Sequence, residues 1–286
     1  MKKVNEKGET LEQFLQNYDP SNYDQCSQTV DMVLMTTIDY ELKLLLIERA
    51  NHPFIGDWAL PGGFVNIDET FEEAVLRELR EETNINKYTY FRQLYTFASV
   101  DRDPRTRIIS TAYLSLTPAS NIKNTKAGDD AKSARWFTVS KSLINQSDYA
   151  RSSYLRLEDE ENGTLIVYKI QDEVNYNYVK TSSELMKESN AKLAADHIKA
   201  INMAVDLVQH RCISSGILFN LLPEECTLRE IQNVYESIIG KKIDTANFRR
   251  DIKKMLIETG NKKIVGGKQV ALYRFNPLYG YLEENI

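Results

Sequence analysis

The sequence lacks any apolar run long enough to cross a bilayer. Its apolar runs, such as 44–47 with Leu42 just before it, are far shorter than the roughly 20 residues that a membrane-spanning helix needs. The N-terminus carries the lysine pair 2–3, but no apolar stretch follows it, which excludes a secretory signal peptide. We therefore expect a soluble, cytoplasmic protein that has no membrane partner.

Cysteine is scarce as well. The three cysteines, Cys26, Cys212 and Cys226, are far apart and odd in number. This spacing has neither the paired pattern of a zinc site nor that of a disulfide framework. We expect three buried free thiols, as in a reducing cytoplasm.

The chain also lacks a net positive charge: its formal net charge is −5. That balance argues against a dedicated nucleic-acid-binding protein. The charge is unevenly distributed, however: residues 240–274 carry +7 and the remainder of the chain carries −12. Such segregation predicts two surfaces with different partners.

The length of the chain predicts more than one domain. It has 286 residues, of which 42% are hydrophobic and 27% charged, a balance typical of soluble globular proteins. We expect a first domain over 1–185, a linker helix within 186–212 and a second domain over 213–286.

The first domain alternates strand-like and helix-like segments. Strands are expected in a hairpin over 29–49 and at 88–100, 108–116 and 134–139, and an amphipathic helix over 70–83. This order predicts a mixed α/β sandwich. A further hairpin over 153–170, with a tight turn at Asn162–Gly163, is expected as an insertion.

Three glutamates occupy one side of the helix expected over 70–83. Glu78, Glu81 and Glu82 are three and four positions apart, so their carboxylates converge on one face and repel one another. A divalent cation, Mg²⁺ or Mn²⁺, relieves that repulsion, and Mg²⁺ prefers carboxylates together with phosphates and water. Such a cation would polarise a diphosphate and activate water. A solvated acidic face is the alternative, and we prefer it for Glu72 and Glu73.

The whole segment 62–85 resembles the Nudix box. The residues that match its pattern are Gly63, Glu69, Arg77, Glu78, Leu79, Glu81, Glu82 and Ile85. The resemblance implies an α/β/α sandwich with a mixed sheet, a metal site formed by Gly63 and the three glutamates, and catalytic roles for Glu69 and Arg77. We expect these two residues to form an ion pair. Asn84 replaces the usual glycine, and asparagine also suits a left-handed helix end.

The wider first domain is similar to the ADP-ribose pyrophosphatases of the Nudix family. Its loop "DRDPR" places Arg102, Asp103 and Arg105 where they would bind a phosphate or ribose, or would simply be loop charges. The aromatic residues Phe54 and Trp58 would either stack on a base or pack in the core.

An aspartate pair and two histidines are further candidates. Asp129 and Asp130 would either help to activate water or cap a turn. The sequence assigns neither His52 nor His197 a partner that would make it catalytic.

The C-terminal part follows the order helix, turn, helix and hairpin. A linker helix over 192–209 precedes helices over 227–239 and 245–258, and the hairpin covers 262–275. This is the outline of a winged helix. It resembles the winged-helix domain of the Nudix-related transcriptional regulators of NAD or sugar metabolism (the NrtR type).

The second of these helices has an apolar side and a basic side. Phe248, Ile252 and Met255 form the apolar stripe. The basic residues of the helix and hairpin, which are candidates for contacting DNA, are Arg249, Arg250, Lys253, Lys254, Lys262, Lys263 and Lys268. Arginines suit guanine edges and lysines suit phosphates. The alternative is a solvated basic face on a protein-interaction module.

Two hypotheses about function follow. The leading one is a metal-dependent Nudix pyrophosphohydrolase that cleaves ADP-ribose, or a related nucleoside diphosphate derivative, to AMP and a sugar phosphate. The alternative is a DNA-binding regulator whose Nudix domain mainly senses such a ligand. The family resemblance suggests a homodimer in either case.

Overall fold

A long β-hairpin forms the centre of the fold. The computed structural model describes residues 3–85, 88–122, 131–212 and 214–279. The strands β1 (Ser27–Ile38) and β2 (Glu41–Arg49) pair antiparallel. Asp39 and Tyr40 between them both have positive φ, as in a type I′ turn. The hairpin predicted over 29–49 is therefore present.

A mixed sheet extends to both sides of this hairpin, in the order β10-β9-β8-β7-β2-β1-β6-β5. β6 lies parallel to β1, whereas the other neighbours in this order pair antiparallel. The short β3 pairs with β2, and β4 pairs with β1. The strands beyond the hairpin are β3 (Trp58–Ala59), β4 (Gly62–Phe64), β5 (Tyr90–Phe97), β6 (Ile108–Leu116), β7 (Ala131–Gln146), β8 (Ala150–Asp159), β9 (Thr164–Asn175) and β10 (Tyr178–Leu185).

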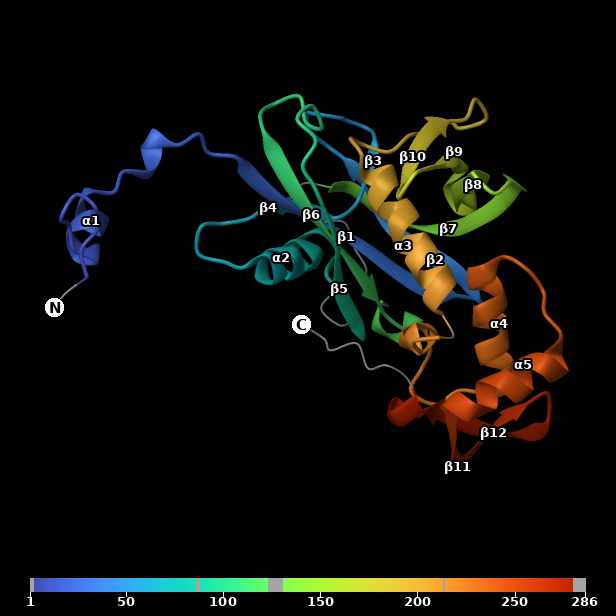
Figure 1. Ribbon diagram of the computed structural model, residues 1–286. Helices are drawn as coiled ribbons and strands as arrows, with labels where there is room; N and C mark the ends of the chain where they lie inside the picture. The colour runs from blue at the N-terminus through green and yellow to red at the C-terminus, as the bar shows by residue number, and fades with distance from the viewer. Residues whose placement is uncertain (1–2, 86–87, 123–130, 213, 280–286) are drawn as a thin grey trace.

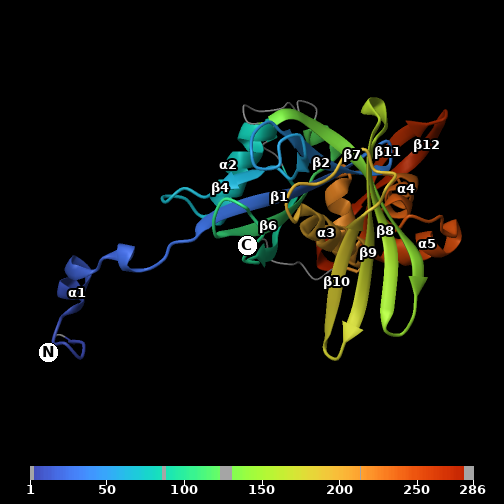
Figure 2. The ribbon, with the colours of Figure 1, turned by 90° about the horizontal axis from the view of Figure 1, so that it is seen from above.

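Two helices cover opposite faces of the sheet (Figures 1 and 2). α2 (Phe71–Thr83) shares a core with Met32 and Leu34 of β1, whereas α3 (His197–Arg211) shares one with Val33 and Met35. Successive side chains of a strand point to opposite faces, so the two helices form the outer layers. The predicted α/β/α sandwich is confirmed.

The helix expected over 192–209 begins only at His197. The residues before it bond to β3 instead: the Trp58 N–H donates to the Lys192 carbonyl at 3.0 Å, and the Ala194 N–H donates to the Trp58 carbonyl at 2.8 Å. These bonds hold the chain extended up to Ala194. α3 is therefore the third layer of the sandwich as well as the connection to the C-terminal part.

The hairpin expected over 153–170 is part of a larger extension made of β8, β9 and β10, which projects from the body in Figure 2. Its turn is longer than predicted, because a 3₁₀ turn over Glu160–Asn162 precedes Gly163 in the left-handed conformation. The strand expected at 134–139 is the middle of β7, which is longer because it pairs with both β2 and β8.

The C-terminal part has the predicted order of a winged helix. It comprises the 3₁₀ helix η4 (Ile217–Leu221), α4 (Leu228–Ile239), α5 (Thr245–Ile252), η5 (Lys253–Met255), β11 (Leu256–Val265), β12 (Lys268–Phe275) and η6 (Pro277–Tyr279). The second helix ends earlier than expected, and the first strand of the wing starts earlier. The winged helix packs directly on the sheet, since the Thr37 hydroxyl donates to the Leu221 carbonyl at 2.9 Å and the Leu42 N–H donates to the Ser237 hydroxyl at 2.8 Å.

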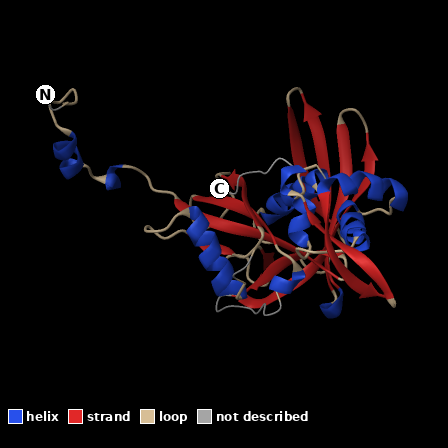
Figure 3. Cartoon of the chain, turned by 90° about the horizontal axis from the view of Figure 1, so that it is seen from below, coloured by secondary structure: helices blue, strands red, loops and turns tan. Residues whose placement is uncertain are grey.

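An N-terminal arm leads away from this body (Figures 1 and 3). It contains α1 (Leu11–Asn17) and a 3₁₀ turn, Pro20–Asn22; a further 3₁₀ turn, Ala119–Asn121, follows β6. Cys26 lies at the end of the arm and is exposed, whereas Cys212 and Cys226 are buried. The expectation of three buried thiols is thus wrong for Cys26. Among the described residues no helix is both long and apolar enough to cross a membrane.

Candidate functional site

The glutamate helix α2 is held firmly at both ends. At its start, the Thr70 hydroxyl and the Glu73 carboxylate form a reciprocal capping box. At its end, Asn84 adopts the left-handed conformation, with φ 59° and ψ 20°, as predicted for the residue that replaces glycine. Leu79 and its apolar neighbours are buried against the sheet, so the opposite, polar side of the helix faces away from the core.

Arg77 connects the acidic residues of this region. Its guanidinium lies 2.6 Å from the Glu69 carboxylate, which confirms the predicted ion pair, and also 2.6 Å from Glu78 and 3.2 Å from Glu81. The hydrogen bonds from Arg77 lower the pKa of Glu69 to about 2. Burial has the opposite effect on Glu78 and raises its pKa. Arg77 thus offsets part of the repulsion among these carboxylates.

Two glycines allow the short strand β4 to approach these carboxylates. A Cβ on Gly63 would lie 2.2 Å from the Glu78 carboxylate, and a Cβ on Gly62 would lie 2.1 Å from the Val30 carbonyl. The Gly62 N–H donates to the Glu82 carboxylate at 2.7 Å. Only glycine fits at these two positions without displacing neighbouring atoms.

The three glutamates are not equivalent. Glu78 and Glu82 line a cavity, and Glu82 is only 8% exposed. The Glu81 side chain is 60% exposed and does not line that cavity. Across the described parts of the chain no three His, Cys, Asp or Glu side chains are grouped closely enough to hold a metal ion. The donor chemistry of Glu78 and Glu82 beside Gly63 nevertheless suits a hard divalent cation.

The cavity has a volume of about 400 Å³. Besides the two glutamates, its walls include Phe54, Arg102, Asp103 and Arg105. The cavity therefore combines the carboxylates of Glu78 and Glu82 with two guanidinium groups from the loop after β5. Opposite charges arranged in this way suit an anionic ligand that binds together with a cation.

The two arginines that the loop after β5 contributes to the cavity differ in burial and in partners. The Arg105 side chain is 43% exposed, pairs with Asp103 at 2.9 Å and lies over the Phe64 ring at 5.3 Å. The Arg102 side chain is only 5% exposed and pairs with Asp196 at 2.9 Å. The hydrogen bonds from Arg105 lower the pKa of Asp103. Both arginines remain candidates for contacting a phosphate.

The expectation that Trp58 contacts a ligand is not supported by its position. Trp58 is 4% exposed and does not line the cavity. Its ring packs edge-on against Phe137 at 4.8 Å, with Arg135 on its face at 5.3 Å. Trp58 is therefore a core residue, whereas Phe54 does line the cavity.

Sequence reasoning missed the group of polar residues around Asp31. The Ser110 hydroxyl donates to Asp31, and His197 Nε2 lies 3.6 Å from the same carboxylate. His197 Nδ1 accepts a hydrogen bond from the Leu60 N–H at 2.9 Å, so His197 has partners in the fold that the sequence did not indicate. Burial lowers the pKa of His197, which favours the neutral ring.

Nothing in the local sequence signals this group, since its members come from β1, β6 and the start of α3. His52, in contrast, is exposed. Asp129 and Asp130 lie outside the described residues.

The basic residues of the winged helix lie on its surface. Phe248, Ile252 and Met255 are buried, as the predicted stripe requires. All seven candidates for contacting DNA, namely Arg249, Arg250, Lys253, Lys254, Lys262, Lys263 and Lys268, are exposed. Two of them have acidic partners, because Arg250 pairs with Asp251 at 3.0 Å and Lys263 pairs with Glu230 at 2.7 Å.

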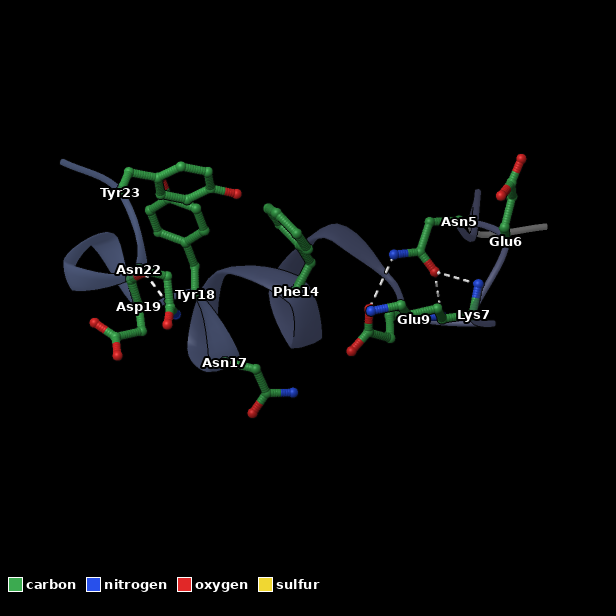
Figure 4. Close-up of a pocket in the computed structure, with 10 residues that line it drawn as sticks. All are labelled: Asn5, Glu6, Lys7, Glu9, Phe14, Asn17, Tyr18, Asp19, Asn22 and Tyr23. Atoms are coloured by element: carbon green, nitrogen blue, oxygen red, sulfur yellow. Dashed lines mark hydrogen bonds between the residues drawn. The ribbon is translucent and has the colours of Figure 1, made fainter.

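A separate hollow of about 480 Å³ lies entirely in the N-terminal arm (Figure 4). Its polar side chains bond to one another, as Asn5 does to Glu9 at 2.9 Å, and the rings of Tyr18 and Tyr23 stack with their centroids 6.2 Å apart. It includes none of the predicted site residues. The candidate site is therefore the cavity beside α2.

Two family models match the chain. Residues 28–157 match the NUDIX domain, and residues 218–275 match the NrtR DNA-binding winged helix domain. The first match includes the glutamate helix and the loop that bears Arg102. The second covers α4, α5 and the wing.

The chain is similar to three known proteins, over most of its length or over a part of it. The chain is 27% identical over 266 residues to the "ADPR responsive transcriptional repressor NtrR" of Acinetobacter baylyi, an alignment that covers 92% of this chain and 87% of that protein. It is 47% identical over 103 residues to the "ADP-ribose pyrophosphatase" of Methanocaldococcus jannaschii, covering 36% of this chain and 58% of that protein. The crystal structure of Shewanella oneidensis NrtR complexed with a 27mer DNA superposes with a TM-score of 0.60 at 28% identity, covering 89% of this chain and 97% of that one.

Proposed function

Since the chain consists of a Nudix domain followed by an NrtR-type winged helix domain, we propose that it is a transcriptional regulator that responds to ADP-ribose or a related nucleoside diphosphate derivative. The cavity beside α2 binds the ligand, and the winged helix binds double-stranded DNA. This proposal reverses the order of the two hypotheses drawn from the sequence. The similarity to a repressor extends over 92% of the chain, whereas the similarity to a pyrophosphatase extends over 36%.

The charges of the cavity support a diphosphate ligand. Arg102 and Arg105 line the same cavity as Glu78 and Glu82, and guanidinium groups form strong charge-assisted hydrogen bonds with phosphates. Phe54 adds an aromatic surface for a base or a ribose. A volume of about 400 Å³ lies within the usual range of small-molecule sites.

The exposed cations of α5 and the wing support DNA as the second partner. Recognition helices present arginines to base edges, and flanking lysines contact phosphates. The single observation that carries the proposal is that the winged helix, which bears this basic surface, packs directly on the domain that contains the cavity, through the Thr37 to Leu221 and Leu42 to Ser237 hydrogen bonds. A protein-interaction module is the alternative for this surface. A homodimer belongs to the proposal, because two related winged helices would bind two half-sites.

DNA binding measured with and without ligand tests the proposal. Fluorescence anisotropy with duplexes from the upstream region of the protein's own gene should show salt-sensitive binding. In the presence of EDTA, which prevents metal-dependent turnover, ADP-ribose should change the DNA affinity, and AMP or ribose 5-phosphate should change it much less. A DNA affinity that ADP-ribose leaves unchanged would contradict the regulator. Absence of DNA binding would favour the interaction module.

Hydrolysis is a second candidate function, favoured by the complete acidic set of the Nudix box. Glu78 and Glu82 would hold Mg²⁺ or Mn²⁺ beside Gly63, and the bound cation would supply charge neutralisation of the diphosphate and activation of water. Arg77 keeps Glu78 in place through their 2.6 Å ion pair, and the two glycines let β4 come close to the substrate.

A substrate screen tests this second candidate. With Mg²⁺ or Mn²⁺, ADP-ribose should yield AMP and ribose 5-phosphate, detected by chromatography. Dinucleoside polyphosphates, NADH, nucleotide sugars and nucleoside triphosphates serve as comparisons. Turnover of triphosphates alone would contradict this substrate assignment, and turnover of none of these compounds would favour a purely sensing role for the Nudix domain. Binding of Mn²⁺ followed by electron paramagnetic resonance measures the metal site independently of turnover.

A further inference from the structure

We propose that Arg102 couples the ligand cavity to the winged helix, because a bound diphosphate and Asp196 compete for its guanidinium group. When Arg102 turns to the diphosphate, it releases Asp196 at the start of α3. This inference rests on the proposed function and adds the device by which the ligand acts on DNA binding.

Arg102 stands between the ligand cavity and Asp196. It lines the cavity that contains Glu78 and also a neighbouring hollow of about 530 Å³, which is lined by Asp196 and Lys199. Asp196 lines only that second hollow. A ligand in the main cavity can therefore reach Arg102 without touching Asp196.

The bonding of Arg102 is incomplete. Its terminal nitrogen Nη2 lies 2.9 Å from Asp196 Oδ1 and 4.0 Å from Asp31 Oδ2. Its Nε is buried and has no hydrogen-bond acceptor in the described part of the chain. Buried donors without acceptors are rare and unfavourable. A diphosphate offers several charged acceptor oxygens and would satisfy this donor.

The carboxylate of Asp196 could also accept hydrogen bonds from the first turn of α3. It occupies the N-cap position of α3, yet its side chain makes no capping hydrogen bond. Its Oδ2 has no hydrogen-bond donor in the described part of the chain, and Lys199 Nζ lies 3.6 Å from it. Aspartate at an N-cap normally accepts from the backbone N–H groups of the first turn. Asp196 therefore has two alternative partners, Arg102 and its own helix.

Two rigid elements connect this region with the winged helix. α3 carries Asp196 at its start, and near its end the Gln209 side chain donates to the Ile238 carbonyl of α4 at 2.8 Å. β1 carries Asp31 beside Arg102, and six residues later Thr37 bonds to Leu221. A change in the first turn of α3 is thus passed along this helix to the contact of Gln209 with α4, and a change in the position of Arg102 reaches the Thr37 contact through Asp31 and β1.

Replacing Asp196 tests the competition directly. In Asp196→Asn the competing charge is removed, so ADP-ribose should bind several-fold more tightly by calorimetry in EDTA. The variant's DNA affinity without ligand should move to the value that the parent shows with ligand. The change produced by ADP-ribose should then fall below about twofold. Asp196→Ser keeps an N-cap side chain but cannot pair with Arg102, and it should behave in the same way.

A matched control keeps the result interpretable. Asp159 is a comparably buried aspartate that pairs with Arg135 at 3.4 Å in the strand extension, and Asp159→Asn should retain the full response to ADP-ribose. Melting curves establish that each variant is folded. A normal response in well-folded Asp196→Asn and Asp196→Ser, or loss of ADP-ribose binding in both, would overturn the proposal. If the parent itself binds no ADP-ribose or no DNA, it is the proposed function that fails.

Discussion

The backbone N–H of Gly62 donates a 2.7 Å hydrogen bond to the carboxylate of Glu82, twenty residues further along the chain. The bond joins the start of β4 to the last turn of α2, and Glu82 is almost completely buried there. Both residues line the ligand cavity. The shape of the cavity therefore depends on a glycine and a glutamate together.

Gly62→Ala should disturb this contact. The added methyl group would lie 2.1 Å from the Val30 carbonyl, so we expect a loss of roughly 1–3 kcal/mol in the free energy of unfolding together with loss of ADP-ribose binding. Gly56→Ala is the control. Its methyl group would have no neighbouring atom within 4 Å, so the substitution causes only the backbone strain of an alanine at a φ of 78°. Urea denaturation and calorimetry measure both effects. A Gly62→Ala protein of parental stability and ligand affinity would contradict the assignment.

Glu82→Gln separates chemistry from sensing. Glutamine keeps the shape of the side chain and an oxygen for the Gly62 N–H, but it removes the charge that binds metal. If the protein is a hydrolase, turnover should fall at least roughly a hundredfold, since metal stabilisation is worth several kcal/mol and each 1.36 kcal/mol is tenfold in rate. Ligand binding should largely persist, so ADP-ribose should still change DNA affinity. Near-normal turnover in the folded variant would show that the metal site lies elsewhere.

The double variant Arg249→Ala, Arg250→Ala should weaken specific DNA binding. Each lost base contact costs about 1–3 kcal/mol. ADP-ribose affinity should stay at the parental value because the cavity and α5 lie in separate parts of the fold. Lys180→Ala, which removes an exposed cation from β10, is the control and should bind DNA normally. Anisotropy at several salt concentrations measures the affinity, and unchanged binding of the double variant would move the DNA surface to other residues.

Glu69→Gln should change how stability depends on pH. The folded-state pKa of Glu69, about 2, lies below the ordinary value of 4.5 because Arg77 donates hydrogen bonds to its carboxylate. The stabilisation is therefore fully present above pH 4.5 and is lost as the pH falls toward 2. The free energy of unfolding of Glu69→Gln should decline less steeply than that of the parent across this range.

Denaturant titrations at several pH values measure this slope. Glu184→Gln, on the exposed strand β10, is the control and should follow the parent. Parallel curves for the parent and Glu69→Gln would show that the ion pair with Arg77 contributes nothing to stability.

Local spacing was sufficient to predict the glutamate helix and its ends. The apolar residues of α2 recur at helical intervals, Thr70 with Glu73 forms a capping box, and Asn84 ends the helix in the left-handed conformation. The β1–β2 hairpin and the Glu69 to Arg77 ion pair are equally local. All of these features depend on residues fewer than ten positions from their partners, or on a short turn.

Tertiary structure alone decided how the site is completed. Asp31, Arg102 and His197 come from three distant segments, and only the packing of β1, the loop after β5 and α3 brings them together. Trp58 could not be assigned from its residue type, since a tryptophan suits a core and a base-binding site equally well; its contact with Phe137 decides for the core. The start of α3 depended likewise on β3, which bonds to the preceding segment. The sequence by itself determined the chemistry and local geometry of the glutamate helix, because those interactions are short-range. Contacts between residues far apart in the sequence decided which other side chains face this helix. No periodic pattern in the sequence predicts such contacts.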